Sequence, residues 1–172
     1  AAMFGHIEVP AGGQILRDGQ PIQAPDYNFW GVTFAKDSNR FYATLGSAGK
    51  AFLVEGDVAA RQMRILREGV ECPSLSPDSS RIAFKKRIGG ASGWWQLTVL
   101  DLQTMKEQPL WNESRSVDDQ VEWLDDTHVM YHLTGKATAA DIWSASIDGK
   151  SPPTLVVANA YSPAVLRAPQ AR

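Results

Sequence analysis

One pattern recurs along the sequence and limits the folds that the chain can adopt. An alternating run of apolar residues, an Asp-containing turn and a second alternating run occur in "VTFAKDSNRFYATL", "PSLSPDSSRIAFKK" and "VEWLDDTHVMYHL", with a truncated copy in "PAVLR". The copies begin at Val32, Pro73, Val121 and Pro163, which lie 41, 48 and 42 residues apart. A period of about 40 to 45 residues is typical of a β-propeller, in which each copy forms one four-stranded blade.

The rest of each copy predicts the two remaining strands of a blade. A third alternating run ends at or near Asp57, Asp101 and Asp148, and a short fourth run follows at 63–66, 108–110 and 154–157. Alternation with a period of two is typical of antiparallel sheets. We therefore predict one all-β domain over residues 1–172, a β-propeller with three four-stranded antiparallel blades at 26–69, 70–117 and 118–160.

The two ends of the chain predict partial blades. Residues 1–25 hold alternating runs that are typical of the outer strands of a preceding blade, and residues 161–172 resemble the inner strand of a following blade. Three blades do not close a ring, because propellers typically contain about four to eight. Two interpretations remain: a fragment of a six- or seven-bladed ring, or a half-ring that forms a homodimer by donating "SPAVLR" of one copy into the N-terminal blade of the other.

Composition and charge exclude several classes of protein. The chain has 172 residues, is 44% hydrophobic and carries a formal net charge of -2, so it is large enough for a core and lacks the basic excess of a nucleic-acid-binding protein. No stretch approaches the roughly 18 apolar residues of a membrane span. The single cysteine, Cys72, rules out an internal disulfide framework, and we expect it to pack as a small apolar residue rather than as a reactive thiol.

The middle copy resembles a known repeat. "SLSPDSSRIAF" followed by "WQLTVLDLQT" is similar to the TolB-like, WD40-like (PD40) propeller repeat, and residues 26–167 resemble the C-terminal half of TolB-like translocation proteins. The resemblance implies a propeller that binds a protein partner. It also implies an extracytoplasmic setting, either periplasmic, secreted or surface-attached.

The aspartates of the repeat have a structural explanation. Pro77 presets the backbone for a turn, and Asp78 can accept hydrogen bonds from backbone N–H groups two residues on. Asp37 and Asp126 stand at comparable places in the other copies. We therefore expect these three aspartates to shape turns rather than to catalyse a reaction.

One candidate site lies where the inner strands begin. Trp30, Glu71, Asp119 and Tyr161 precede these strands at equivalent positions, which predicts that they surround one mouth of the central channel, with Asp118 adding negative charge. A ring of carboxylates can bind a cation or a basic peptide. The alternative is an ordinary solvated loop face.

A second candidate site is a basic and aromatic loop edge. Trp94 and Trp95 follow the flexible stretch "RIGGASG", and Lys85, Lys86 and Arg87 lie just before them. Such an edge can bind a carbohydrate or a protein partner. The alternative is that one tryptophan packs between blades and the other covers it.

Catalytic and metal-binding patterns are weak. His128 and His132 are four apart on an expected strand, roughly 13 Å along one face, and His6 lies far away in the sequence. The Gly-x-Ser-x-Gly motif of many hydrolases does not occur. We expect no cofactor or metal, and we predict a non-enzymatic interaction scaffold. The alternative is an enzyme that acts on polysaccharide or glycan in the central channel, which requires paired carboxylates or a cluster of histidines that holds a metal.

The repeat also predicts which side chains pack between blades. These side chains occupy equivalent places on inner strands or lie on the second and third strands, and they are Phe34, Leu75, Trp123, Val165, Phe84, Val99 and Trp143.

Overall fold

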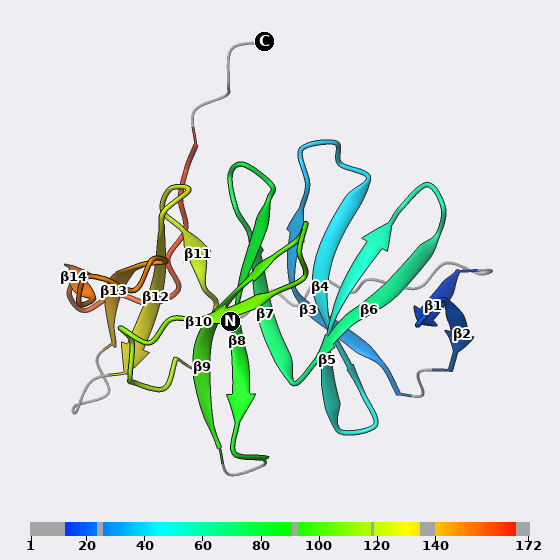
Figure 1. Ribbon diagram of the computed structural model, residues 1–172, viewed down its shortest axis with the longest axis horizontal. Helices are drawn as coiled ribbons and strands as arrows, with labels where there is room; N and C mark the ends of the chain where they lie inside the picture. Colours follow the sequence, from blue (N-terminus) through cyan, green and yellow to red (C-terminus); the bar gives the residue numbers. More distant parts are fainter. Residues whose placement is uncertain (1–12, 24–25, 91–92, 118, 135–139, 168–172) are drawn as a thin grey trace.

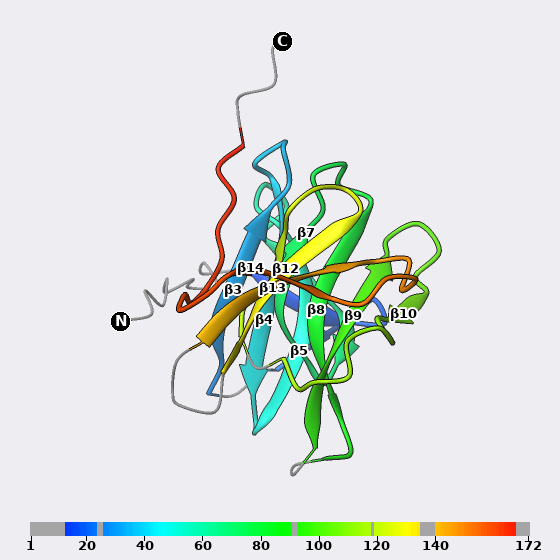
Figure 2. The ribbon, with the colours of Figure 1, turned by 90° about the vertical axis from the view of Figure 1, so that its left-hand side faces the viewer.

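The computed structural model describes residues 13–23, 26–90, 93–117, 119–134 and 140–167. Its regular elements are β-strands in three sheets, which lie side by side in chain order along the long axis of the molecule (Figures 1 and 2). The described part of the chain contains no helix that is long and apolar enough to cross a membrane. The predicted all-β propeller architecture is confirmed.

Each sheet contains one four-stranded antiparallel blade whose strands pair in chain order. The first blade comprises β3 (Asn28–Phe34), β4 (Arg40–Ser47), β5 (Lys50–Asp57) and β6 (Gln62–Glu68). The second comprises β7 (Val70–Leu75), β8 (Arg81–Ile88), β9 (Trp94–Asp101) and β10 (Glu107–Pro109). The third comprises β11 (Glu122–Trp123), β12 (His128–Thr134), β13 (Ala140–Ser146) and β14 (Thr154–Val157).

An N-terminal hairpin extends the first blade. Its strands are β1 (Gln14–Arg17) and β2 (Gln20–Ile22), and β1 pairs in parallel with β6, so the first sheet has six strands. This placement differs from the expectation that residues 1–25 form outer strands of a preceding blade, although residues 1–12 lie outside the described part. The physical reason is burial, because Ile15 packs into the apolar cluster of the first blade that contains Phe41 and Met63.

The C-terminal residues 161–167 lie outside any strand. The guanidinium of Arg167 donates hydrogen bonds to the backbone carbonyls of Trp123 and Leu124, which anchors this segment beside the inner strand of the third blade. Residues 168–172 lie outside the described part of the chain. An inner strand of a following blade, and the head-to-tail dimer that depends on it, stay predictions.

The blades are held together by apolar clusters. One cluster joins the second and third blades and contains Trp123 and Val99, and another joins the first and second blades and contains Phe84. Leu75 and Trp143 pack against these clusters while partly exposed, and Val165 is half-buried.

The prediction that Phe34 packs between blades is wrong. Phe34 is 57% exposed because it lies beside Phe41, at 5.8 Å between ring centroids, whose apolar cluster contains no residue of the second or third blade. The pairing of β3 with β4 also shifts register between Trp30 and Thr33. The pairing of β7 with β8 has a corresponding shift between Glu71 and Ser74.

These bulges occur at equivalent points of the first two blades. Gly31 and Cys72 both have positive φ, at 59° and 54°, and the N–H of Cys72 donates to Thr44 Oγ1 at 2.9 Å. Cys72 is half-buried at this point. Each bulge directly follows a residue that the sequence places at the channel mouth, Trp30 or Glu71, and so helps to orient that residue.

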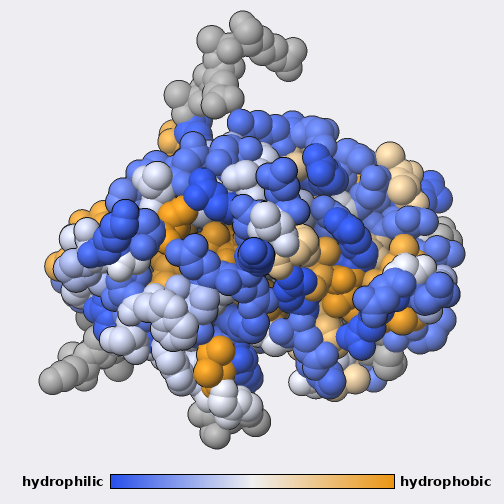
Figure 3. All heavy atoms as spheres, viewed as in Figure 1, coloured by the Kyte–Doolittle hydropathy of each residue, from blue (hydrophilic) through white to orange (hydrophobic). Residues whose placement is uncertain are grey.

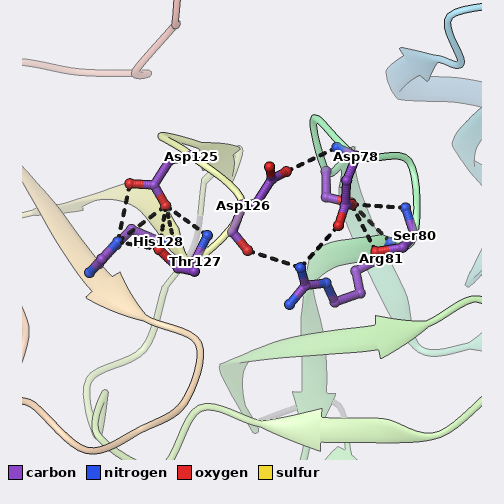
Figure 4. A network of polar contacts seen from close by, with 8 residues as sticks. Asp78, Ser80, Arg81, Asp125, Asp126, Thr127 and His128 are labelled. Atoms are coloured by element: carbon purple, nitrogen blue, oxygen red, sulfur yellow. Dashed lines mark hydrogen bonds and ion pairs between the residues drawn. The ribbon is translucent and has the colours of Figure 1, made fainter.

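The turn aspartates mostly behave as expected. Asp37 accepts hydrogen bonds from the backbone N–H groups of Asn39 and Arg40. Asp78 accepts a hydrogen bond from the backbone N–H of Ser80 and forms an ion pair with Arg81 (Figure 4). Burial raises the pKa of Asp78, but hydrogen bonds from serine hydroxyls, the Ser80 N–H and Arg81 outweigh burial and hold that pKa well below its usual range.

The third blade departs from this pattern. Asp125, not Asp126, accepts the N–H groups of Thr127 and His128 (Figure 4). Asp126 instead accepts the N–H of Asp78 at 2.9 Å, so it links the turns of the second and third blades. The expectation for Asp126 is therefore wrong, because the compressed third copy moves the turn aspartate one position earlier.

We expect Asp125 to make stability depend on acid pH. Burial raises its pKa, but hydrogen bonds from Thr127 and His128 outweigh burial and lower that pKa to about 2. The unfolded pKa is about 3.9, so this contribution to stability is fully present above about pH 5 and is lost as the pH falls toward 2. Urea titrations at pH 5 and pH 2.5 should show a smaller loss of unfolding free energy for Asp125→Asn than for the natural chain. The control Asp18→Asn lies on the exposed β1–β2 turn and should match the natural chain; equal losses in all three proteins would contradict the prediction.

Candidate functional site

A hollow of about 370 Å³ opens between the first and second blades, and we call it the interblade hollow. It lies where the β4–β5 hairpin, the β6–β7 turn and the facing ends of β8 and β9 meet. Its polar and aromatic lining residues are Asp26, Asn28, Trp30, Ser47, Lys50, Glu68, Glu71, Arg87 and Trp95.

Trp30 forms one wall of the interblade hollow. It stands on β3 immediately before the Gly31 bulge and lies against Gly46 of β4, where an added Cβ would come within 2.6 Å of the indole ring. A glycine at position 46 therefore leaves the space that the indole occupies. The ring is partly exposed toward the hollow.

Trp95 and Glu71 form the opposite side. Lys85 Nζ lies 3.4 Å from the Glu71 carboxylate and 4.5 Å from the centre of the Trp95 ring, and the Arg87 guanidinium lies 5.0 Å from the same ring. Cations over an indole face are attracted by its negative charge density. Lys85 is buried, so this arrangement is a firm support for Glu71 rather than a mobile surface contact.

Two carboxylates of the interblade hollow are paired with lysines. Lys50 Nζ lies 2.8 Å from Glu68, and its hydrogen bond lowers the pKa of that carboxyl. Glu71 is paired with Lys85. A wall with paired charges of both signs beside an indole matches the polar and aromatic surface of a protein partner better than it matches an isolated cation.

The predicted basic and aromatic edge is divided by the alternation of β8. Lys85 and Arg87 lie beside Trp95, whereas the ammonium of Lys86 contacts Glu107, which also pairs with Arg67 at 2.9 Å. Lys86 therefore contacts a residue of its own blade, and the ion pair of Arg67 with Glu107 joins the first blade to the second. Trp94 begins β9, is moderately exposed and does not line the interblade hollow.

The residues of the predicted channel mouth make their contacts in two groups. Asp119 and Tyr161 meet around His132, whose Nδ1 contacts the Asp119 carboxylate and whose ring makes an edge contact with Tyr161 at 5.5 Å between centroids. Asp118 lies outside the described residues. The structure thus brings Trp30 together with Glu71 and Asp119 together with Tyr161, and a single mouth that all four surround stays a prediction.

Ser162 completes the cluster around His132, but the geometry is not that of a hydrolase. Its hydroxyl donates to Asp119 at 3.1 Å, and its backbone N–H approaches His132 Nδ1 at 3.4 Å. In a Ser-His-Asp triad the imidazole lies between the hydroxyl and the carboxylate, so that it can accept the serine proton. Here the hydroxyl bonds directly to the carboxylate.

A second hollow of about 470 Å³ lies along the inner strands, beside Phe34, Leu75, Glu122 and Arg167. Burial raises the pKa of Glu122, although Ser74 Oγ donates to the carboxylate at 3.0 Å and Arg167 lies 3.8 Å away. Glu122 is the one carboxylate among the described residues that line this hollow. The described residues contain no group of three or more His, Cys, Asp or Glu side chains that could hold a metal ion.

The sequence missed several residues of these sites. Lys50 and Glu68 reach the interblade hollow from the ends of hairpins, and His132 and Glu122 lie beside the C-terminal segment. Their positions follow from contacts between repeats, for which the alternating pattern carries no signal.

Three antiparallel four-stranded blades arranged side by side, with inner strands β3, β7 and β11 in succession, define an arc of a β-propeller. Solved propellers superpose on it. TolB from Acinetobacter baumannii does so with a TM-score of 0.62 at 13% identity, over 79% of this chain and 33% of that chain. A puromycin-hydrolyzing peptidase from Mycobacterium tuberculosis gives 0.59 at 14% identity, over 83% and 23%.

A chain of the nidogen/laminin complex gives a TM-score of 0.59 at 12% identity, over 76% of this chain and 48% of that chain. No protein-family model matches the sequence, and a search of curated proteins finds no match. The chain therefore shares the propeller fold with these structures and spans less than half of the length of each. The resemblance to TolB-like propellers is confirmed as a resemblance in fold.

Proposed function

We propose that this chain is a non-enzymatic interaction scaffold and that a protein partner binds at the interblade hollow. The observation that carries the proposal is the rigid wall formed by Trp30, Glu71 and Trp95, which two blades hold in place through buried Lys85 and the bulge at Gly31. Tryptophan and arginine in firmly supported surroundings are the side chains that most often dominate the affinity of protein interfaces.

The chemistry of the described sites favours binding over catalysis. A glycoside hydrolase uses two carboxyl groups about 5 to 10 Å apart, and the second hollow has Glu122 alone among its described lining residues. Structures with this fold include TolB, a peptidase and a chain of a two-protein complex, so the fold is compatible with protein binding. An extracytoplasmic location is part of the proposal and rests on the resemblance to TolB.

Site-specific crosslinking tests the proposal. A photoreactive p-benzoylphenylalanine at position 50, on the rim of the interblade hollow, should give a discrete adduct in cells that produce the natural partner. Trp30→Ala should weaken that adduct by about tenfold or more, because tryptophan anchors at interfaces typically contribute about 2 kcal/mol or more. Circular dichroism would verify that the variant remains folded.

The matched control carries the same photoreactive group at position 111, which is exposed on the loop after β10. A specific partner should not be captured there. Capture at both positions alike, or an adduct from position 50 that Trp30→Ala leaves unchanged, would show that the interblade hollow is not the binding site.

A further inference from the structure

The C-terminal segment 161–167 places one side chain in a polar site at the end of β11. The guanidinium of Arg167 donates hydrogen bonds to the carbonyls of Trp123 and Leu124, the second at 3.2 Å. It also lies 3.8 Å from the carboxylate of Glu122. We call these two carbonyls and the carboxylate the Glu122 corner, which adjoins the second hollow. The structure therefore shows what this corner holds, and the occupant is an arginine.

The second and third blades together fix the Glu122 corner. Ser74 Oγ on β7 donates to the other oxygen of the Glu122 carboxylate at 3.0 Å, and the indole N–H of Trp123 donates to the Ser74 carbonyl. Trp123 is fully buried between the two blades. Burial also raises the pKa of Glu122, because the carboxylate is partly withdrawn from water. A carboxylate in such surroundings is destabilised when its cationic partner is removed, so the corner favours a cation.

The acceptors of the corner suit a guanidinium better than an ammonium. A guanidinium carries five N–H groups in a rigid planar fork, whereas an ammonium is a compact point charge with three. Two different nitrogens of Arg167, Nη1 and Nη2, serve the two carbonyls. We therefore expect the corner to prefer arginine over lysine.

The segment that carries this arginine is open to replacement. Residues 161–167 belong to no strand, and Tyr161 and Leu166 are 58% and 99% exposed. The side chains of Arg167 and Glu122 are 39% and 29% exposed, so a second molecule can reach the pair. Another arginine can thus compete for the corner without unfolding a blade.

The second hollow gives room for the residues beside such an arginine. Its volume is about 470 Å³, and its walls include Phe34, Leu75 and Pro77. Phe34 is 57% exposed, whereas on the face of the molecule in Figure 3 hydrophilic residues predominate and hydrophobic residues gather between the blades. An exposed aromatic ring in a hollow fits apolar side chains of a ligand. Lys36 lines the same hollow and would repel a second basic residue.

We propose that the Glu122 corner binds the arginine of a peptide segment from another protein, and that Arg167 is an internal occupant which this segment displaces. The ligand is an extended segment in which apolar residues flank one arginine, as they do in "AVLR" at 164–167. This inference goes beyond the proposed function, because the residues of the corner do not line the interblade hollow.

A titration with the peptide acetyl-Ala-Val-Leu-Arg-amide tests the proposal, with the NMR signal of the Trp123 indole N–H as the reporter. Arg167→Ala empties the corner, and the peptide should then shift this signal with a dissociation constant on the order of 0.1 to 1 mM. Binding to the natural chain should be about tenfold weaker, because the tethered arginine competes at a high effective concentration. Absence of a shift in Arg167→Ala up to about 10 mM, tenfold above the weakest expected constant, would overturn the proposal.

Matched variants separate the guanidinium site from a general effect of charge. Arg61→Ala removes an exposed arginine from the turn after β5 and should bind the peptide as weakly as the natural chain. Lysine in place of the arginine of the peptide should weaken binding to Arg167→Ala about tenfold, and so should Glu122→Gln added to that variant. Equal binding in any of these three comparisons would contradict the proposal.

The other indole signals show where the peptide binds. Shifts at Trp30 or Trp111 without a shift at Trp123 would place the peptide elsewhere and overturn the proposal. Circular dichroism would verify folding, and Arg167→Gln replaces Arg167→Ala if the latter does not fold. The two sites share no residue, so failure here is distinguishable from failure of partner binding at the interblade hollow.

Discussion

Replacement of Trp123 by alanine should lower the free energy of unfolding by about 3 to 5 kcal/mol. The side chain is fully buried between the second and third blades, and its indole N–H donates to the carbonyl of Ser74 at 2.8 Å. Alanine would leave a cavity between two blades and a buried carbonyl without its partner, and both effects destabilise the fold.

Urea unfolding followed by circular dichroism measures this loss. Trp123→Phe keeps much of the side-chain volume, so its free energy of unfolding should fall by less than that of Trp123→Ala. This variant can therefore be measured even if Trp123→Ala fails to fold. Trp111→Ala is the matched control, because that tryptophan is 75% exposed and its removal should change stability by no more than about 0.5 kcal/mol. A loss below about 1 kcal/mol for Trp123→Ala would mean that the interface between the blades is not packed around this residue.

Gly31→Ala should destabilise the chain by roughly 2 to 5 kcal/mol. The residue has a φ of 59°, and an added Cβ would stand 2.9 Å from the Cα of Cys72 and 3.2 Å from Gln120 Oε1. The left-handed backbone disfavours any side chain, and the Cys72 backbone of the neighbouring blade cannot rotate out of the way. Movement of the inner strand should also displace Trp30 and weaken partner binding at the interblade hollow.

Gly49→Ala separates the cost of the left-handed backbone from the cost of the contact with the neighbouring blade. Gly49 has a φ of 72° in the β4–β5 turn, and nothing lies within 4 Å of its added Cβ. The free energy of unfolding of Gly49→Ala should therefore fall only by the cost of the left-handed backbone, about 1 to 2 kcal/mol. The same denaturation experiment compares both variants. Equal losses at positions 31 and 49 would show that the inner strands are not in close contact.

Several features of this protein follow from local sequence chemistry. Alternating apolar residues require strands with one face turned inward, and the Ser-Pro-Asp turn around Asp78 supplies backbone hydrogen bonds within a few residues. Repetition of both signals predicts the four-stranded blades and the burial of Trp123 without any knowledge of the neighbours. The sequence pattern predicts the wrong turn aspartate in the third blade. The third copy of the repeat is one residue shorter before its turn, so Asp125 takes the place that the pattern assigns to Asp126.

The site depended on contacts between blades. The bulges at Gly31 and Cys72 shift the strand register beside Trp30 and Glu71, and both of these residues line one hollow.

By itself the sequence determined the blades, their turns and the alternation of buried side chains, because these depend on hydrogen bonds and periodicity within one repeat. Only the tertiary structure decided that β1 covers β6 and that Lys85 stands between Glu71 and Trp95. These outcomes depend on which surfaces of separate repeats meet, and a pattern that is the same in every repeat does not contain that information.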